Sequence, residues 1–455
     1  MRPLAKPLKR YRSGQYQDQN LNIAPQESTH AAPTTFMKWY VVAILTLVYV
    51  FNFVDRQIIS VLQEPMRVEL GLSDTQLGLL QGLTFAVFYA TMGIPLARWA
   101  DVGIRRDVIA LSVGVWSIMT ALCGVAQNFS QLLLARIGVG IGEAGGSPPS
   151  HSIISDLFPP GSRALPLSIY SSGITFGVFL AYVFGAWVND NFGWRPVFIA
   201  VAIPGIFLAL LVRFTLKEPL RGRYDAPGSD RPPPAMRAVF KQLLNTRTFI
   251  HLSIAAALHA FVGYGLSAFL VSFYVRSYAI PIDQISIVAL PLGFIIGIGG
   301  AIGGFAGGFL ADRLSRRDVR WSMWVPAIAN LLAAPCAAAA FLSHHFYLSL
   351  CLYFIPLAFA YMYLGPTLAT THALVAPRMR ALASALLFFI VNLIGLGLGP
   401  TLVGVVSDAL TPKYGAESLR YALVATVFVN VWSALHYYIA SRHLAKDLKQ
   451  AVAAN

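Results

Sequence analysis

The chain has 455 residues, of which 56% are hydrophobic and only 12% are charged, about half the charged fraction of an ordinary soluble domain. This composition excludes a water-soluble globular protein. The formal net charge is +14, but no groove-reading motif accompanies the basic residues, so we expect no nucleic acid among the partners.

Apolar runs long enough to cross a bilayer of about 30 Å recur along the chain, and they predict twelve membrane-spanning helices. The runs cover residues 37–62, 76–97, 107–127, 131–155, 166–188, 195–216, 249–276, 285–310, 321–342, 346–372, 380–409 and 419–441. A polar segment of about 36 residues precedes the first run, which we therefore interpret as helix 1 and not as a cleaved signal peptide.

The basic residues are distributed unevenly over this pattern. With both termini in the cytoplasm, about 27 of the 34 Lys and Arg residues fall in cytoplasmic segments, as the positive-inside rule requires. We therefore expect a multi-pass protein of the cell (inner) membrane with both termini cytoplasmic. The densest basic segments, the N-terminal tail and residues 213–247, are expected to contact membrane lipids.

The predicted organisation is an all-α membrane protein with two pseudo-symmetric six-helix bundles. Its segments are a cytoplasmic tail (1–36), the first bundle (37–216), a cytoplasmic linker with a surface helix (217–248), the second bundle (249–442) and a cytoplasmic tail (443–455). The surface helix is expected because apolar residues recur with helical spacing after a Pro-rich stretch in the linker.

Four ionisable residues lie inside apolar runs, Asp55 and Arg56 in helix 1 and Arg136 and Glu143 in helix 4. A charged side chain is costly against lipid, so all four are expected to face the protein interior. Arg136 and Glu143 are two helical turns apart and share a face, whereas Asp55 and Arg56 point about 100° apart. We therefore predict two ion pairs, Asp55–Arg136 and Arg56–Glu143.

This cluster is either a static bridge between two helices or a switch. In the switch, a carboxylate takes up a proton and frees a guanidinium, which can then bind a phosphate. We favour the switch, because small residues and packing hold helices together in lipid at lower cost. Glu143 is the expected proton carrier, since it lies nearer the bilayer midplane than Asp55.

Gly and Pro residues follow Glu143 closely along the chain. The segment Gly145–Pro149 should therefore break the regular hydrogen bonding of helix 4.

A pattern Ala-Asp-x-x-x-Arg-Arg-Asp-Val occurs twice, at Ala100–Val108 and Ala311–Val319, each time between the second and third helices of a bundle. Such a loop can tie helix ends together in one conformation and release them in another; the alternative is a static anchor. The candidate gating residues are Asp101, Arg105, Arg106, Asp312, Arg313, Arg316 and Arg317.

Helices 7 and 10 of the second bundle carry many aromatic residues and no charge until their ends. They are candidates for an apolar wall opposite the charged cluster, an asymmetry that suits an amphipathic ligand. The alternative is that these rings belong to the core or face lipid. The candidate residues are Phe261, Tyr264, Phe269, Phe273, Tyr353 and Tyr361.

The segment Gly307–Arg317 (GGFLADRLSRR) resembles the Gly-x-Leu-Ala-Asp-Arg-x-x-Arg-Arg loop signature of the major facilitator superfamily. In the first copy Val102 stands where an Arg is usual. The segments Phe51–Leu62 and Leu132–Pro160 resemble the Spinster family, proton-dependent exporters of lysophospholipids and sphingosine phosphate. This resemblance implies the major facilitator fold and supports gating by the loops.

The sequence thus predicts a proton-coupled secondary transporter that moves a lipid-like substrate of the lysophospholipid or sphingoid phosphate class by alternating access. The alternatives are a symporter or exporter of small organic anions or drugs, and a membrane receptor or scaffold. The sequence contains no metal-ligand spacing and no nucleophile motif, so we expect no enzyme activity, no metal and no cofactor beyond the coupling proton. We also expect a monomer.

Overall fold

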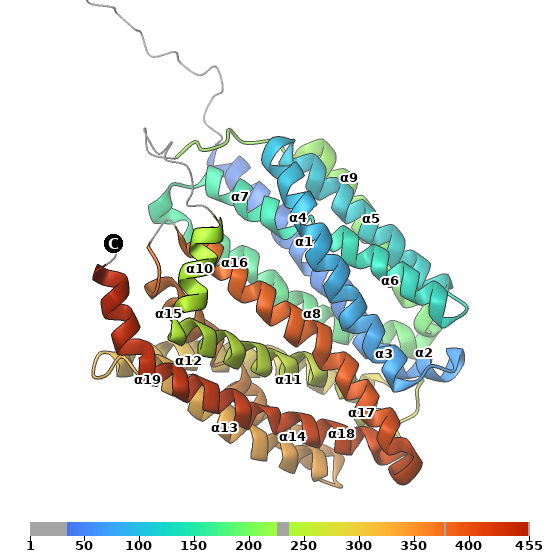
Figure 1. Cartoon of the computed structure of the whole chain (residues 1–455). Helices are drawn as coiled ribbons and strands as arrows, with labels where there is room; N and C mark the ends of the chain where they lie inside the picture. The colour runs from blue at the N-terminus through green and yellow to red at the C-terminus, as the bar shows by residue number, and fades with distance from the viewer. Residues whose placement is uncertain (1–33, 225–235, 377–378, 454–455) are drawn as a thin grey trace, which may run out of the picture.

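The computed structural model describes residues 34–224, 236–376 and 379–453, and these form helices joined by short connections (Figure 1). Ten stretches within them are long and apolar enough to span a membrane. The last of the ten covers 70 residues, Leu382–Ala451, which is long enough for two crossings. The remaining predicted crossing, helix 4, is divided into two shorter helices.

The first half contains nine α-helices in the described residues. They are α1 (Thr35–Val61), α2 (Gln63–Leu70), α3 (Asp74–Gln81), α4 (Leu83–Val102), α5 (Arg105–Val125), α6 (Phe129–Glu143), α7 (Ser147–Leu157), α8 (Ala164–Phe192) and α9 (Trp194–Thr215).

The second half follows the short helix α10 (Met236–Asn245), which lies where the sequence predicts a surface helix. Its helices are α11 (Arg247–Ser277), α12 (Ser286–Ser315), α13 (Trp321–Leu342), α14 (Phe346–Ala360), α15 (Leu364–Ala373), α16 (Arg380–Val391), the π-helix η3 (Asn392–Leu398), α17 (Gly399–Tyr414), α18 (Ser418–Val427) and α19 (Val429–Ala453).

Several predicted crossings are less regular than an apolar run suggests. Helix 2 is interrupted at Gly82, helix 10 between α14 and α15, and helix 11 passes through η3. At the first of these, α3 crosses η3 and α17 so closely that a Cβ on Gly78 would overlap Pro400 O, and one on Gly82 would lie 2.7 Å from Gly397 O. Small residues permit this approach, which is typical of helices packed in a membrane.

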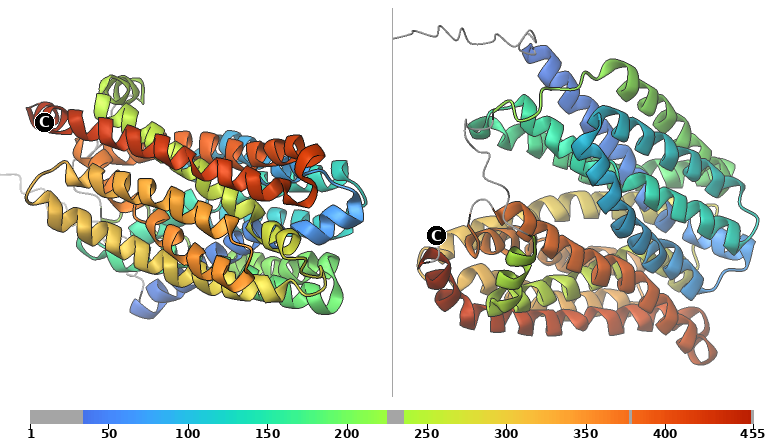
Figure 2. Two further views of the ribbon diagram at one scale, coloured as in Figure 1. Left: turned by 90° about the horizontal axis from the view of Figure 1, so that it is seen from below. Right: turned by 45° about the horizontal axis from the view of Figure 1, so that its top comes forward.

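The two halves meet at one end of the molecule, where α3 packs on α17 and α12 packs on α8 (Figures 1 and 2). We call this the Asp74 end, and the opposite end, where α4 and α9 finish and α5 begins, the Arg105 end. Within the described residues, every hydrogen bond between the halves lies between the level of Gln57, which donates to Ser267, and the Asp74 end. In the described part of the chain, hydrogen bonds therefore join the halves only on the Asp74 side of Gln57.

Each half caps a helix of the other half at this junction. Asp190, near the end of α8, accepts hydrogen bonds from the backbone N–H groups of Ile285 (2.9 Å) and Ser286 (3.0 Å) at the start of α12. Asp408 of α17 accepts from the N–H groups of Asp74 (3.0 Å) and Thr75 (2.8 Å) at the start of α3. Because α8 and α17 belong to the fifth crossing of their halves, and α12 and α3 to the second, the two caps are pseudo-symmetric.

An ion network closes the same end. The Arg276 guanidinium of α11 bonds to both oxygens of Asp74, at 2.8 and 2.6 Å, and to Glu64 Oε2 at 2.7 Å. Glu64 also pairs with Arg67. All of these acids belong to the first half and Arg276 belongs to the second, so the network must break before the halves can separate at the Asp74 end.

Candidate functional site

An ion pair between α1 and α6 lies inside the first half. Arg56 Nη2 is 2.7 Å and Nε is 3.1 Å from Glu143 Oε2, and the Glu143 side chain is fully buried. This is one of the two pairs that the sequence predicts, and the structure confirms the contact. The Arg56 side chain keeps 16% of its surface exposed, so the arginine is partly accessible beside a buried carboxylate.

Aromatic rings surround the Arg56 guanidinium. The ring centroids of Phe53, Phe85 and Tyr89 each lie 5.1 Å from its central carbon. Phe85 lies between the two arginines, 5.3 Å from the central carbon of Arg136. Arginine stacks on such rings through its planar face, which holds the guanidinium in a fixed orientation.

The second predicted ion pair, Asp55–Arg136, does not form, and that prediction is wrong. Both residues are 2% exposed, but within the described residues they make no ion pair with each other, and Asp55 Oδ1 and Arg136 Nε have no hydrogen-bond partner. Asp55 points away from Arg56, into the core of the first half, where Thr120 and Trp116 lie beside it. Helix geometry put the two residues at similar depth, but the side chains that fill the space between helices decide the partner.

The polar atoms of this region are incompletely bonded. Glu143 Oε1, Trp116 Nε1 and Thr120 Oγ1 are buried and have no partner among the described residues. A buried polar atom without a partner is costly, and each one in a native core needs an explanation. Several of them gather around Asp55 and Glu143, so this cluster holds polar groups that can take new partners.

The backbone beside Glu143 is irregular, as the sequence predicts. Helix α6 ends at Glu143, and α7 begins at Ser147 with two prolines in its first turn. Gly142 and Gly145 permit the turn because a Cβ on either would collide with α5, at the Trp116 backbone and the Ser112 hydroxyl. The break places Glu143 at a helix end, beside α1 and α5.

The predicted apolar wall is only partly formed. Phe269, Phe273 and Tyr353 are buried in the core of the second half, at 0%, 0% and 4% exposure, and cannot line a cavity in this conformation. Phe273, for example, packs on Tyr274, Tyr278 and Phe341. An apolar run cannot distinguish the core face of a helix from a ligand face. Phe261 and Tyr264 are partly buried and Tyr361 is exposed, so these three remain candidates.

The first signature loop is held tightly within its own half. Arg105 is buried and bonds to Asp156 of α7 and to Glu218, which follows α9, while Glu218 also accepts from the Arg106 backbone N–H. Arg221 donates to the backbone carbonyls of Ala100, Asp101 and Gly103, at the end of α4. A guanidinium from the linker thus binds around Val102, the position where the family signature has its own Arg.

The second loop has few contacts. Asp312, Arg313, Arg316 and Arg317 are exposed, and within the described residues none of them forms an ion pair; Arg313 lies over the Phe309 ring at 6.0 Å. In the first loop the Asp101 side chain is also exposed and, in the same part of the chain, without an ion pair. The two acids therefore make no side-chain contact that holds this conformation together.

We expect Asp101→Asn and Asp312→Asn to favour the conformation seen here. Neither change removes a side-chain bond from this structure, so any bond lost belongs to the other conformation, and transport rate should change more than ligand affinity. Labelling of engineered cysteines at both ends with impermeant reagents measures the shift. Unchanged labelling at both ends would make the loops static anchors.

Several residues of the site and of the junction have no distinguishing pattern in the sequence. Phe85 and Tyr89 are four apart on α4 and share a face, but no local pattern brings that face to Arg56. Asp190 and Asp408 each lie near the end of an apolar run and resemble ordinary helix-end charges. Only the packing of one half on the other gives them helix termini to cap.

Comparison with known proteins agrees with this architecture. The sequence profile of the Major Facilitator Superfamily matches residues 45–400. The chain belongs to the major facilitator superfamily. It is a Spinster-like member, because the solved structure of a bacterial homologue of the human lysosomal transporter Spinster, inward-facing and unoccupied, superimposes with a TM-score of 0.85. That protein is 37% identical, over 91% of this chain and 99% of its own.

The relatives of this Spinster-like protein are named as transporters of different substrates. An MFS-type efflux pump of Mycolicibacterium smegmatis is 33% identical over 90% of this chain and 94% of its own length. The sphingosine-1-phosphate transporter of Danio rerio is 25% identical over 94% of this chain and 89% of its own. A probable L-galactonate transporter of Escherichia coli is 35% identical, but over only 35% of each chain. The protein is thus a membrane transporter of the alternating-access type and not an enzyme.

Proposed function

We propose that this transporter moves an amphipathic, lipid-like anion of the lysophospholipid or sphingoid phosphate class and couples the movement to protons. The observation that carries the proposal is the Arg56–Glu143 pair, in which a partly exposed arginine lies among aromatic rings and binds one carboxylate oxygen. A phosphate group can replace Glu143 and bind Arg56 through two of its oxygens. An alkyl chain can then lie along Tyr264 and the partly exposed aromatic residues of the second half.

Arg56 is positioned for access from the Arg105 end. The halves make no hydrogen bond on that side of Gln57 in the described residues, whereas the caps and the Arg276 network close the Asp74 end. In the proposed orientation the Arg105 end faces the cytoplasm of a cell (inner) membrane, as the positive-inside rule predicts. The conformation is then inward-facing, and a single chain forms the complete pathway.

We propose that Asp55 carries the proton, whereas the sequence alone predicts Glu143 as the carrier. Glu143 already has a cationic partner, whereas Asp55 is equally buried without an ion pair in the described residues. Burial disfavours the charged form of an unpaired carboxylate, so Asp55 takes up the proton more readily.

Substrate and proton then bind cooperatively. An anion on Arg56 neutralises positive charge that otherwise favours ionised carboxylates, so the pair of carboxylates binds a proton more tightly. By linkage, protonation strengthens substrate binding by the same factor. The coupling needs no metal and no organic cofactor.

We expect Asp55→Asn to abolish proton-driven accumulation of labelled lysophospholipid in proteoliposomes, while counterflow exchange continues. The amide mimics the protonated acid, so the substrate can still bind but no proton is released. Glu143→Gln frees Arg56 and should bind the substrate at least as tightly as the wild type across pH, with accumulation still pH-dependent. Wild-type pH dependence in Asp55→Asn, together with its loss in Glu143→Gln, would return the proton to Glu143.

A second candidate function is transport of small organic anions, which the partial similarity to a probable L-galactonate transporter favours. Arg56 can bind a carboxylate as well as a phosphate. Counterflow of labelled lysophospholipid against labelled sugar acids in the same proteoliposomes separates the two candidates. Exchange of the sugar acid alone would replace the lipid proposal.

A further inference from the structure

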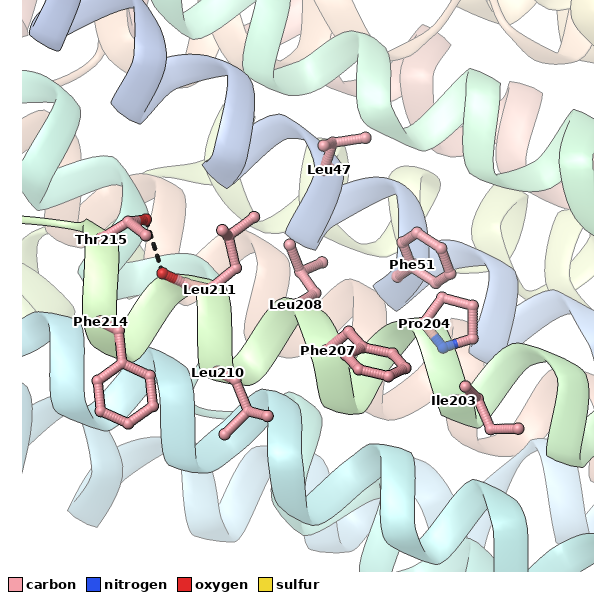
Figure 3. Close-up of a pocket in the computed structure, with 10 residues that line it drawn as sticks. All are labelled: Leu47, Phe51, Ile203, Pro204, Phe207, Leu208, Leu210, Leu211, Phe214 and Thr215. Carbon is pink, nitrogen blue, oxygen red and sulfur yellow. Dashed lines mark hydrogen bonds between the residues drawn. The ribbon is translucent and has the colours of Figure 1, made fainter.

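A hollow of about 780 Å³ runs along the outer surface of the first half, between α1 and α9 (Figure 3). Its side chains come from these two helices only, and all of them are apolar except Thr215. Phe207 and Phe214 are exposed by 66% and 77%. Because both helices are candidate membrane spans, the hollow opens toward the lipid and not toward the second half.

The length of the hollow matches one leaflet of a bilayer. Its lining on α9 extends from Ile203 to Thr215, which at 1.5 Å per residue is about 18 Å along the helix axis. Half of a hydrocarbon core of about 30 Å is about 15 Å. The hollow therefore reaches from one membrane surface to just beyond the midplane.

One end of the hollow is polar. The Thr215 hydroxyl accepts a hydrogen bond from Tyr40 Oη at 2.6 Å and donates to the Leu211 carbonyl. Trp39 and Tyr40 lie in the first turns of α1, and such residues mark the level of lipid headgroups. The opposite end, at Phe51 and Ile203, is entirely apolar.

Basic residues flank the polar end. Lys38 is 3.5 Å from the Tyr224 hydroxyl, and Lys217 is exposed just beyond α9; within the described residues neither has a carboxylate partner. Arg213, in the last turn of α9, has only a loose contact of 3.7 Å with Asp107 and keeps 49% of its side chain exposed. This end of the hollow is therefore complementary to a negative headgroup.

We propose that the hollow binds one acyl chain of an anionic bilayer phospholipid, with the headgroup at Lys38, Arg213 and Lys217. The lining belongs entirely to the first half, so this site is separate from the transport pathway at the interface of the halves. The same helix α1 carries Arg56, five residues beyond the deep end of the hollow at Phe51. A lipid bound against α1 and α9 holds this part of α1 in place and is part of the transporter, not its cargo.

The test uses the full chain in nanodiscs of phosphatidylcholine that contain phosphatidylglycerol with a photoactivatable acyl chain. We expect cross-links to concentrate on Leu47, Phe51 and residues 203–215, and to be competed by unlabelled phosphatidylglycerol but not by added phosphatidylcholine. Ile203→Trp fills the deep end, and Arg213→Gln with Lys217→Gln removes headgroup charge. Each should reduce labelling by about fivefold, the effect of losing about 1 kcal/mol of binding.

Two matched variants serve as controls. Leu134→Trp enlarges an apolar side chain that is 67% exposed on α6, and Arg442→Gln neutralises an exposed arginine of α19; both should leave the labelling unchanged. Labels spread evenly over the exposed apolar surface, or equal competition by phosphatidylcholine, would reduce the hollow to ordinary lipid contact. Displacement by lysophospholipid at low concentration would assign the hollow to the substrate instead, and cross-links between two chains would assign it to a second copy.

Discussion

Arg56→Lys should lower the initial rate of substrate transport by about 10-fold to 100-fold, although the positive charge is kept. The guanidinium uses two nitrogens on Glu143 Oε2 and stacks among three rings, and an ammonium reproduces neither contact. Losing a charge-assisted hydrogen bond of about 1.5–3 kcal/mol corresponds to a rate change of that size. Uptake of labelled lysophospholipid into proteoliposomes at saturating and subsaturating concentrations measures it.

Arg320→Lys is the matched control, because the Arg320 side chain is 48% exposed and its nearest carboxylate, Asp318, lies 4.0 Å away. It should transport normally. Thermal unfolding and size-exclusion profiles of both variants show whether each one is folded. Near-normal transport by a folded Arg56→Lys would remove Arg56 from substrate binding.

The double variant Asp190→Ala/Asp408→Ala should shift the conformational equilibrium by about 30-fold toward the state that is open at the Asp74 end. Each carboxylate caps a helix of the opposite half, and a helix cap contributes about 1 kcal/mol, so two caps give about 2 kcal/mol. Separation of the halves exposes both helix termini to water in any case. The caps therefore stabilise only the conformation that is closed at this end.

Spin labels at Gln127→Cys and Asp283→Cys, one in each half at the Asp74 end, report the distance between the halves. The two single variants should each produce about half of the free-energy shift, since the caps are pseudo-symmetric and share no residue. Asp447→Ala is the control: Asp447 caps α11 at Thr248 from within the second half, so its loss should lower thermal stability without changing the distance distribution. A double variant with the wild-type distribution would show that the caps do not gate the transporter.

The sequence by itself determined the class of protein and one contact of the site. Apolar runs predict membrane-spanning helices, because every crossing must be apolar over about 20 residues whichever helices pack against it. Charges within such runs are rare, so Arg56 and Glu143 stand out, and their depth and facing can be calculated from helix geometry alone. The break after Glu143 was equally visible, since Gly and Pro act on the local backbone.

Only the tertiary structure decided which groups surround those charges. Asp55 and Arg136 have compatible depths, but the rotation of α1 against α5 and α6 places Thr120 and Trp116 beside Asp55. The same dependence applies to Phe85 at Arg56 and to the separation of Phe273 and Tyr264 into core and site. The caps at Asp190 and Asp408 form only because one half packs against the other. That packing depends on surfaces made by residues hundreds of positions apart in the sequence, and a local sequence pattern cannot predict it.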